Sequence, residues 1–383
     1  PNNYRIFGPD EALSNRLGAV FEVTNRKWNG ETIKGDEYLN TDGAIIDTIL
    51  SEHACEGMLE GYLLTGRHGF IHTYESFSRI IDSMVSQHAK WIKISKELPW
   101  RSPISSLNIL LTSHVWQQDH NGYTHQDPGF LNHIVTKKPE IVRVYLPIDA
   151  NTLLSTFDHI SKTKDYINVV VASKHLSVQW LDKNEAIKHC RKGIGILDFA
   201  SNDEGTPDII LASAGDTPNL EIIAASVLLR KNIPNIKVRV VNVIDLMRLV
   251  SHDEHPHGLT DLEYDRIFTK DKPIIFAFHG YPNLIHELTY KRANNNLHVR
   301  GYIEEGAITT SFDMRVLNKI DRYNLCKLAI KHLKLNSIEV IKLNDYCDIM
   351  LAKHKKYIKE YGVDMPEVTN FEFDFKGRDQ YEL

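Results

Sequence analysis

The chain has 383 residues, which at roughly 150 residues per domain predicts two to three domains. Its 42% hydrophobic and 25% charged residues are ordinary for a globular protein, so disorder, collagen-like repeats and coiled coils are excluded. The 45 Lys and Arg residues against 50 Asp and Glu residues give a net charge of −5, which argues against nucleic acid or an anionic membrane as a partner.

The four cysteines lie far apart and form no CxxC pair, so neither a disulfide framework nor a zinc site is expected. This usage fits a reducing cytoplasm. No apolar run long enough to span a membrane occurs, and the first residues lack the basic-then-apolar order of a signal peptide. The sequence starts at Pro1 rather than Met, from which we expect a chain cut from a longer protein.

Helical and extended patterns alternate from about residue 40. Apolar residues recur at helical spacing in some segments, and between them lie short apolar runs typical of buried strands. This alternation predicts a mostly parallel sheet covered on both faces by helices. The expected elements, in chain order, are helices 52–64 and 75–94, strand 107–111, helix 130–135, strand 141–146, helix 152–160 and strand 167–172.

A polar stretch at 180–206 interrupts the pattern, and we place a domain boundary near residue 185. The predicted domains are therefore 1–185 and 186–383. The segment from residue 365 is rich in Phe and acids, and we expect it to wrap the surface. The expected elements of the second α/β domain are strand 208–214, helix 219–230 and strands 237–243 and 273–278.

The loop 113–129 follows a predicted strand, where ligands bind in parallel α/β sheets. It holds three histidines and several amides and acids without any Lys or Arg. Long loops in compact domains are usually functional, although a polar surface loop that caps the next helix would look similar. The histidine spacings fit no tight metal-ligand pattern.

Glu52 stands in the first turn of the helix predicted at 52–64. A carboxyl group at this position usually caps the helix or interacts with its dipole. The functional alternative requires burial, which would let the carboxyl group hold a proton and share a hydrogen bond.

Three further segments could bind anions, although basic residues at the ends of elements are mostly solvated caps. A histidine-rich segment at 251–257 could suggest a metal site, but its proline and acids are typical of an ordinary loop. No P-loop, dinucleotide-binding, HExxH or GxSxG motif is present. The anion-binding candidates are 14–16, 65–69 and 173–175.

Four long strings together resemble the phosphoketolases, thiamine diphosphate enzymes related to transketolase. The resemblance covers nearly the whole chain, and four strings in the right order are far more specific than one short motif. It implies an α/β fold in which a transketolase-like pyrimidine-binding domain, with a parallel sheet flanked by helices, precedes a smaller α/β C-terminal domain. The strings are SEHACEGMLEGYLLTGRHGF, YESFSRIIDSMVSQHAKWIK, SHVWQQDHNGYTHQDPGF and GYIEEGAITTSFDMRVLNKIDRYNL.

The family cleaves xylulose 5-phosphate or fructose 6-phosphate with inorganic phosphate, giving acetyl phosphate and an aldose phosphate. Its members are much longer, and their N-terminal half carries a GDG-to-Asn signature that binds Mg²⁺ and the cofactor diphosphate. This sequence lacks that signature. The resemblance therefore implies a homodimeric aldehyde-lyase whose own N-terminal domain is missing here, and we expect this chain alone to be inactive.

The resemblance assigns Glu52 to the aminopyrimidine ring of the cofactor, where its carboxyl group promotes the imino form. Tyr74 would stack on that ring. His53 and Arg67 would contact the residues that bind the cofactor rather than the cofactor itself. Met58 departs from the family, which usually has an aromatic residue there; we expect only a packing change.

The remaining roles implied by the resemblance concern the substrate. Asn121 and His125 would lie near the reacting sugar carbons as hydrogen-bond donors and proton-transfer groups. Gln118 and Asp119 would orient them. The substrate phosphate or the attacking inorganic phosphate would be held by Ser14, Arg16 and Lys174, with Asn121 and His125 also contacting substrate.

Two alternatives stay open. The chain could be a transketolase-like subunit of a split thiamine diphosphate enzyme, which a neighbouring gene for the GDG-bearing half would favour. It could also be a non-catalytic module for oligomerisation or ligand sensing, in which case Glu52→Gln would leave a parent activity intact. We assign the strings GYIEEGAITT and NKIDRY to structure and subunit contact.

Overall fold

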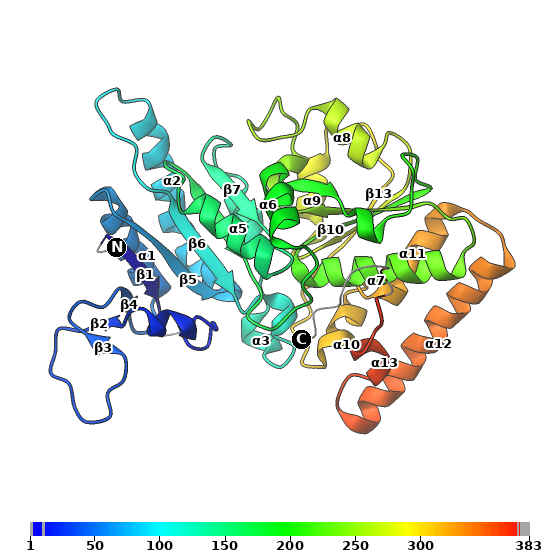
Figure 1. Ribbon diagram of the computed structural model, residues 1–383, viewed down its shortest axis with the longest axis horizontal. Helices are drawn as coiled ribbons and strands as arrows, with labels where there is room; N and C mark the ends of the chain where they lie inside the picture. Colours follow the sequence, from blue (N-terminus) through cyan, green and yellow to red (C-terminus); the bar gives the residue numbers. More distant parts are fainter. Residues whose placement is uncertain (1–2, 10–11, 374, 376–383) are drawn as a thin grey trace. The chain divides into compact units, whose positions relative to one another are not determined.

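The computed structural model describes residues 3–9, 12–373 and 375 (Figure 1). The chain forms two compact units, which we describe separately. The predicted domains 1–185 and 186–383 are sequence segments and stay a prediction. The first unit comprises Pro1–His114, Asp127–Tyr145 and Leu153–Leu176, and the second comprises Val115–Gln126, Leu146–Thr152 and Ser177–Leu383.

The first unit contains an eight-stranded sheet in the order β3-β2-β4-β1-β5-β6-β8-β7, in which every pair of neighbours is parallel. Its central strands are buried runs of apolar residues, as in sheets covered on both faces. The strands are β1 (Tyr4–Gly8), β2 (Arg26–Lys27), β3 (Leu39–Asn40), β4 (Ile45–Asp47), β5 (His68–Tyr74), β6 (Leu107–Thr112), β7 (Val142–Tyr145) and β8 (Ile167–Val171).

The helix predicted at 52–64 has those bounds in the structure, as α1. The helix predicted at 75–94 is instead a 3₁₀ segment, η2, followed by α2. The hydroxyl of Ser78 donates to the carbonyl of Glu75 at 2.5 Å, a local bond that competes with the regular helical pattern. The bounds are η1 (Gly18–Glu22), α1 (Glu52–Leu64), η2 (Glu75–Ile81), α2 (Asp82–Lys96), α4 (Phe130–Ile134) and α5 (Ala150–Ile160), whose first residues belong to the second unit.

The second unit contains a five-stranded sheet in the order β13-β12-β10-β11-β9, with only β9 antiparallel to its neighbour. The strands are β9 (Ile194–Ile196), β10 (Ile209–Ala214), β11 (Val238–Val243), β12 (Ile274–Phe278) and β13 (Leu297–Arg300). The helices are η3 (Val115–Gln117), α3 (Gly122–His125), α6 (Lys183–Lys192), η4 (Asp198–Ala200), α7 (Asp216–Asn232), η5 (Leu246–Leu249), α8 (Asp261–Phe268), α9 (Pro282–Thr289), α10 (Ser311–Leu317), α11 (Arg322–Leu333), α12 (Ile338–Tyr361) and α13 (Pro366–Thr369).

A buried ion cluster joins three helices of the second unit. Helix α7 packs on the sheet and against α11 (Figure 1). The carboxylate of Glu221 on α7 accepts bonds from Arg322 Nε at 2.9 Å and Nη2 at 3.0 Å, and from Arg315 Nη1 at 2.7 Å. Burial alone would raise the pKa of Glu221, but the two guanidinium groups outweigh it and lower the pKa to about 2. Glu221 is therefore a charged structural anchor.

The segment from Met365 packs more deeply than the expected surface tail. Met365 and Val368 are buried. The ring of Phe371 lies 4.4 Å from the guanidinium carbon of Arg322, and Phe373 meets Trp180 edge-on at 5.2 Å. Aromatic side chains thus fix this segment to the unit, while residue 374 and residues 376–383 of the predicted tail lie outside the described residues. Within the described ranges, no helix has the length and apolar character needed to cross a membrane.

Candidate functional site

Glu52 is the first residue of α1 and is only 4% exposed. No other group in the described part of the chain hydrogen bonds to its carboxyl group, and Ser51 at the N-cap makes no side-chain cap. The hydroxyl of Ser51 instead lies 3.3 Å from Nε2 of His53, whose ring is exposed. The buried carboxyl group of Glu52 therefore keeps its hydrogen-bonding capacity for a ligand.

Tyr74 and Lys174, both predicted from the sequence as site residues, lie together in the first unit. Tyr74 ends β5, and Lys174 follows β8, so both stand at the carboxyl edge of the parallel sheet. Lys174 Nζ is 5.0 Å from the centroid of the Tyr74 ring, a cation–π contact. The ring of Phe77 also lies parallel to the ring of Tyr74, with 5.9 Å between the ring centroids. This edge thus presents an aromatic platform beside a positive charge.

Asn15, between Ser14 and Arg16 in the sequence, belongs to a buried polar network. Asn15 Oδ1 accepts from the hydroxyl of Thr112, and Asn15 Nδ2 lies 3.0 Å from Nδ1 of His72. Burial lowers the pKa of His72 to about 4, so its ring is neutral at pH 7. Asn15 therefore ties the loop that carries Ser14 and Arg16 to strands β5 and β6, while both flanking side chains are exposed.

Gly8 makes room for this network. A Cβ atom at Gly8 would lie 2.1 Å from Nε2 of His72, closer than any packed atoms approach. Asn15, His72 and Thr112 were not predicted from the sequence as supporting residues. The available signals were an amide between two predicted phosphate ligands and a threonine directly after the strand predicted at 107–111.

The loop residues of the sequence prediction belong to the second unit, where two segments hold them. Asp119 Oδ2 accepts from the hydroxyl of Ser311 at 2.8 Å, and its carbonyl accepts from the amide of Thr309 at 2.9 Å. Trp116 Nε1 donates to the carbonyl of His279 at 2.9 Å. The segment around 301–311, which the sequence analysis assigned to structure, thus positions the loop through Asp119.

Gln126 closes the same loop. Its Nε2 donates to the carbonyls of Gln118 at 2.7 Å and Ala307 at 2.9 Å, and its Oε1 accepts from the hydroxyl of Tyr302 at 3.1 Å. A Cβ atom at Gly122 would lie 2.3 Å from a backbone oxygen, so only glycine permits this close approach.

Asn121 and His125 flank the short helix α3 of this loop. Asn121 is exposed and His125 half-buried, with Nδ1 of His125 2.5 Å from the hydroxyl of Thr124. Arg67 follows the far end of α1 from Glu52, and a 13-residue helix separates their ends by about 20 Å. The role of Arg67 behind the groups that contact the cofactor stays a prediction.

Comparison with protein families identifies both parts of the chain. Residues 1–163 match the family described as D-xylulose 5-phosphate/D-fructose 6-phosphate phosphoketolase, and residues 174–373 match the XFP C-terminal domain. A probable phosphoketolase of Clostridium acetobutylicum is 58% identical over 97% of this chain and 47% of the relative. A probable phosphoketolase of Gloeobacter violaceus is 56% identical over 96% of this chain and 47% of the relative. The chain thus spans about half the length of these curated relatives.

Solved structures agree on the fold. Transketolase from Leishmania mexicana aligns with a TM-score of 0.66 at 12% identity, covering 87% of this chain and 43% of that one. A split gene transketolase, described as an inactive beta4 tetramer, aligns with a TM-score of 0.54 at 14% identity, covering 84% of this chain and 96% of that one. The predicted fold class is confirmed as the transketolase-like α/β fold, and the chain belongs to the phosphoketolase family.

Proposed function

We propose that this chain forms the pyrimidine-binding and C-terminal parts of a thiamine diphosphate-dependent phosphoketolase, an aldehyde-lyase. The proposed reaction cleaves xylulose 5-phosphate, fructose 6-phosphate or both with inorganic phosphate, giving acetyl phosphate and an aldose phosphate. The observation that carries the proposal is the buried carboxyl group of Glu52, which has no hydrogen-bond partner among the described residues, in a chain of this family. Four free cysteines fit the proposed place in a reducing cytoplasm.

The residues present fit an aminopyrimidine ring. A ring nitrogen needs a hydrogen-bond partner, which Glu52 can supply, and the ring face needs an apolar platform, which Tyr74 can supply. Thiamine diphosphate, when bound, provides the electron sink that allows a carbon–carbon bond beside a carbonyl group to break. We assign Mg²⁺ to the N-terminal segment of the longer relatives and to no residue of this chain.

Glu52 is proposed to hold the proton that moves between its carboxyl group and the ring nitrogen. Because no group of the described residues competes for this carboxyl group, its hydrogen bond to a ligand would be strong in the buried setting. Lys174 and Arg16 are proposed, with Ser14, to bind phosphate through charge-assisted hydrogen bonds. The neutral network around Asn15 would position Ser14 and Arg16 without adding charge of its own.

Asn121 and His125 are proposed to contact the sugar and to move a proton during loss of water from it. Asp119 and Gln118 would fix their loop, which fits the bonds from Ser311 and Gln126. In this proposal the protein acts as a homodimer with its own N-terminal domain, and this chain alone is inactive.

A second candidate is a subunit of a split thiamine diphosphate enzyme. The structural likeness to the split gene transketolase favours this candidate, because the alignment covers 96% of that chain. Purification of the natural protein distinguishes the two, because a split enzyme would yield the diphosphate-binding half as a separate polypeptide.

The test is acetyl phosphate formation from xylulose 5-phosphate and phosphate. The chain is assayed alone and joined to the N-terminal segment that the relatives carry, with thiamine diphosphate and Mg²⁺ present. We expect turnover only in the joined protein, and a loss of at least a hundredfold in Glu52→Gln. Glu97→Gln, at an exposed carboxyl group of the same unit, is the control. Turnover by the chain alone, or full activity in Glu52→Gln, would contradict the proposal.

A further inference from the structure

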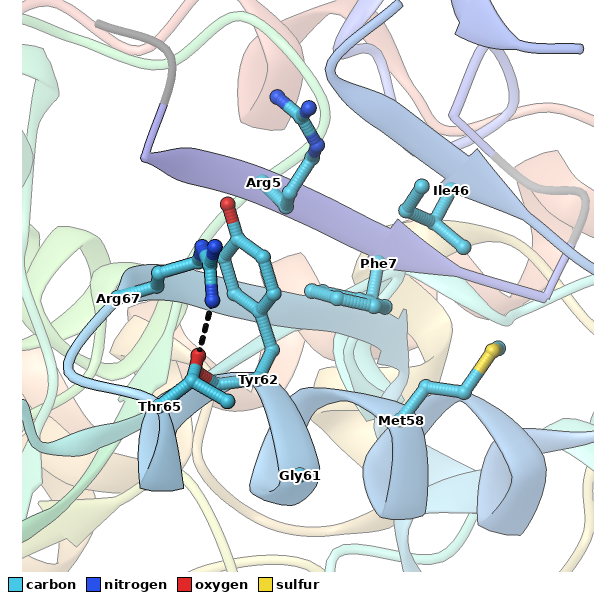
Figure 2. A pocket seen from close by; sticks show the side chains of 8 residues that line it. All are labelled: Arg5, Phe7, Ile46, Met58, Gly61, Tyr62, Thr65 and Arg67. Carbon is cyan, nitrogen blue, oxygen red and sulfur yellow. Dashed lines mark hydrogen bonds between the residues drawn. The ribbon is translucent and has the colours of Figure 1, made fainter.

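A pocket of about 360 Å³ opens on the first unit, and its residues come from β1, β4, the C-terminal half of α1 and the segment between α1 and β5 (Figure 2). The mechanism proposed above does not use it, because it lies toward the opposite end of α1 from Glu52. It includes Arg67, from a segment that the sequence singled out for anion binding. The lining residues are Arg5, Phe7, Ile46, Met58, Gly61, Tyr62, Thr65 and Arg67.

The charge of the pocket is positive and unbalanced. Neither Arg5 nor Arg67 has an acidic partner among the described residues, and none of the lining residues is acidic. Arg67 Nη1 donates to the hydroxyl of Thr65 at 2.7 Å, and Arg5 Nη1 donates to the carbonyl of Tyr4 at 3.2 Å. Each guanidinium group has five donors, so most remain available to an anion.

The other side of the pocket is apolar. Phe7 meets the ring of Tyr62 edge-on at 5.9 Å, and Ile46 and Met58 continue this surface away from Arg67 (Figure 2). Met58 is 41% exposed, so a flat apolar group could cover it and gain burial. The hydroxyl of Tyr62 is buried without a hydrogen-bond partner in the described ranges, a costly state that an acceptor oxygen would relieve.

We propose that this pocket binds a phosphate monoester that carries a flat apolar ring. The phosphate oxygens would accept from Arg5 and Arg67, since guanidinium groups bind phosphate through paired hydrogen bonds. The ring would lie against Phe7 and Met58. The volume lies within the range of about 300–1,000 Å³ that is typical of small-molecule sites. This proposal does not depend on the proposed function.

The test measures binding of phenyl phosphate to the chain by isothermal titration calorimetry. Inorganic phosphate and phenol are titrated separately, because each carries one half of the proposed ligand. We expect phenyl phosphate to bind at least tenfold more tightly than either. Equal binding of inorganic phosphate would overturn the role of the apolar side, and absence of phenyl phosphate binding would overturn the proposal.

Variants then locate the site. Arg67→Gln and Arg5→Gln should each raise the dissociation constant at least tenfold, and Met58→Trp should abolish binding by filling the pocket. Arg101→Gln is the matched control, since this arginine also stacks on an aromatic ring of the first unit, at 4.9 Å from Trp91. Arg16→Gln tests the proposed active site instead: if it alone weakens binding, phenyl phosphate binds there and the pocket proposal is wrong.

Discussion

Each unit of the molecule contains a fully buried glutamate, Glu56 in the first unit and Glu221 in the second. The carboxyl group of Glu221 is charged, whereas that of Glu56 is neutral. In the second unit, Arg315 and Arg322 flank Glu221 and lower its pKa to about 2. In the first unit, burial and the neighbouring carboxyl group of Glu60 raise the pKa of Glu56 to about 10. Within the described residues, no nitrogen or hydroxyl group hydrogen bonds to either oxygen of Glu56. A proton on Glu56 can be donated to the carboxyl group of Glu60.

The comparison shows that burial alone does not decide the charge of a carboxyl group. Burial favours the neutral form of both glutamates, and only the two guanidinium groups overcome it at Glu221. Glu221, one of several buried acids of the second unit, is thus a charged structural anchor. In the first unit, by contrast, neither Glu52 nor Glu56 forms an ion pair within the described residues.

The largest expected effect comes from removing a cation from the second unit. Arg322→Met leaves the buried carboxylate of Glu221 with Arg315 as its remaining cationic partner. It should lower the free energy of unfolding by about 3–5 kcal/mol. Urea unfolding followed by circular dichroism measures the change. Arg191→Met, at an exposed arginine of the same unit, should change stability by less than about 0.5 kcal/mol.

A second change distinguishes lost pairing from lost packing. In a Glu221→Gln background, Arg322→Met should cost clearly less than in the native chain, because the buried charge is gone. Equal costs in both backgrounds would show that Arg322 acts by packing, and the contrast between the two units would lose its basis.

The raised pKa of Glu56 in the first unit predicts a pH dependence of stability. In the folded chain the pKa of Glu56 lies far above the ordinary value of 4.5, so Glu56 keeps a proton at pH values where an unfolded glutamate has lost it. Because the folded state then binds more protons, stability falls as pH rises, by up to ~1.4 kcal/mol per pH unit. Glu56→Gln should flatten this decline between pH 7 and pH 9, measured by urea unfolding at each pH.

His88 limits the pH window in which Glu56 can be observed. Its Nδ1 lies 3.3 Å from Glu60, and burial lowers the pKa of His88 to about 4. Between pH 4 and 6.5 the unfolded state therefore binds more protons at this histidine, and stability rises with pH. The two effects oppose each other below pH 6.5, so Glu56 dominates only above it. Because burial also raises the pKa of Glu60, some decline can remain in Glu56→Gln. A decline above pH 7 that is undiminished in this variant would refute the assignment.

The neutral network of the first unit should respond to steric change rather than to charge. Gly8→Ala places a Cβ atom against His72 Nε2 and should cost about 1–3 kcal/mol. The melting temperature should fall accordingly. In a His72→Ala background the same change should cost much less, and an undiminished cost there would place the strain elsewhere.

The fold could be predicted from the sequence where apolar periodicity is strong. Helix α1 and strands β6 and β8 were predicted within a residue or two, because their apolar patterns directly reflect which faces are buried. The short strands β2 and β3 escaped prediction, since two residues each carry no period. The antiparallel strand β9 escaped for a similar reason, as its three residues include a glycine.

The individual residues of the candidate site could be predicted from the sequence, but the contacts between them could not. Tyr74 and Lys174 were both named from the sequence, yet their contact depends on the parallel order of β5 and β8, which strand patterns alone do not fix. The support of Asp119 by Ser311 joins positions 192 residues apart. Such partners are invisible to local spacing, and so was the difference between Glu221 and Glu56, because it depends on which side chains from distant segments surround each acid.

The smallest expected effect concerns an ion pair on the surface. Lys162 and Asp158 lie 2.6 Å apart at i,i+4 spacing, with side chains 70% and 66% exposed. Water already solvates both charges, so Lys162→Met should lower the free energy of unfolding by no more than about 0.5 kcal/mol. Urea unfolding at low and high salt measures it, and the loss should vanish at high salt. A loss as large as that of Arg322→Met would mean that burial does not determine how much an ion pair contributes to stability. A small loss would show that the Glu221 cluster contributes more because it is buried.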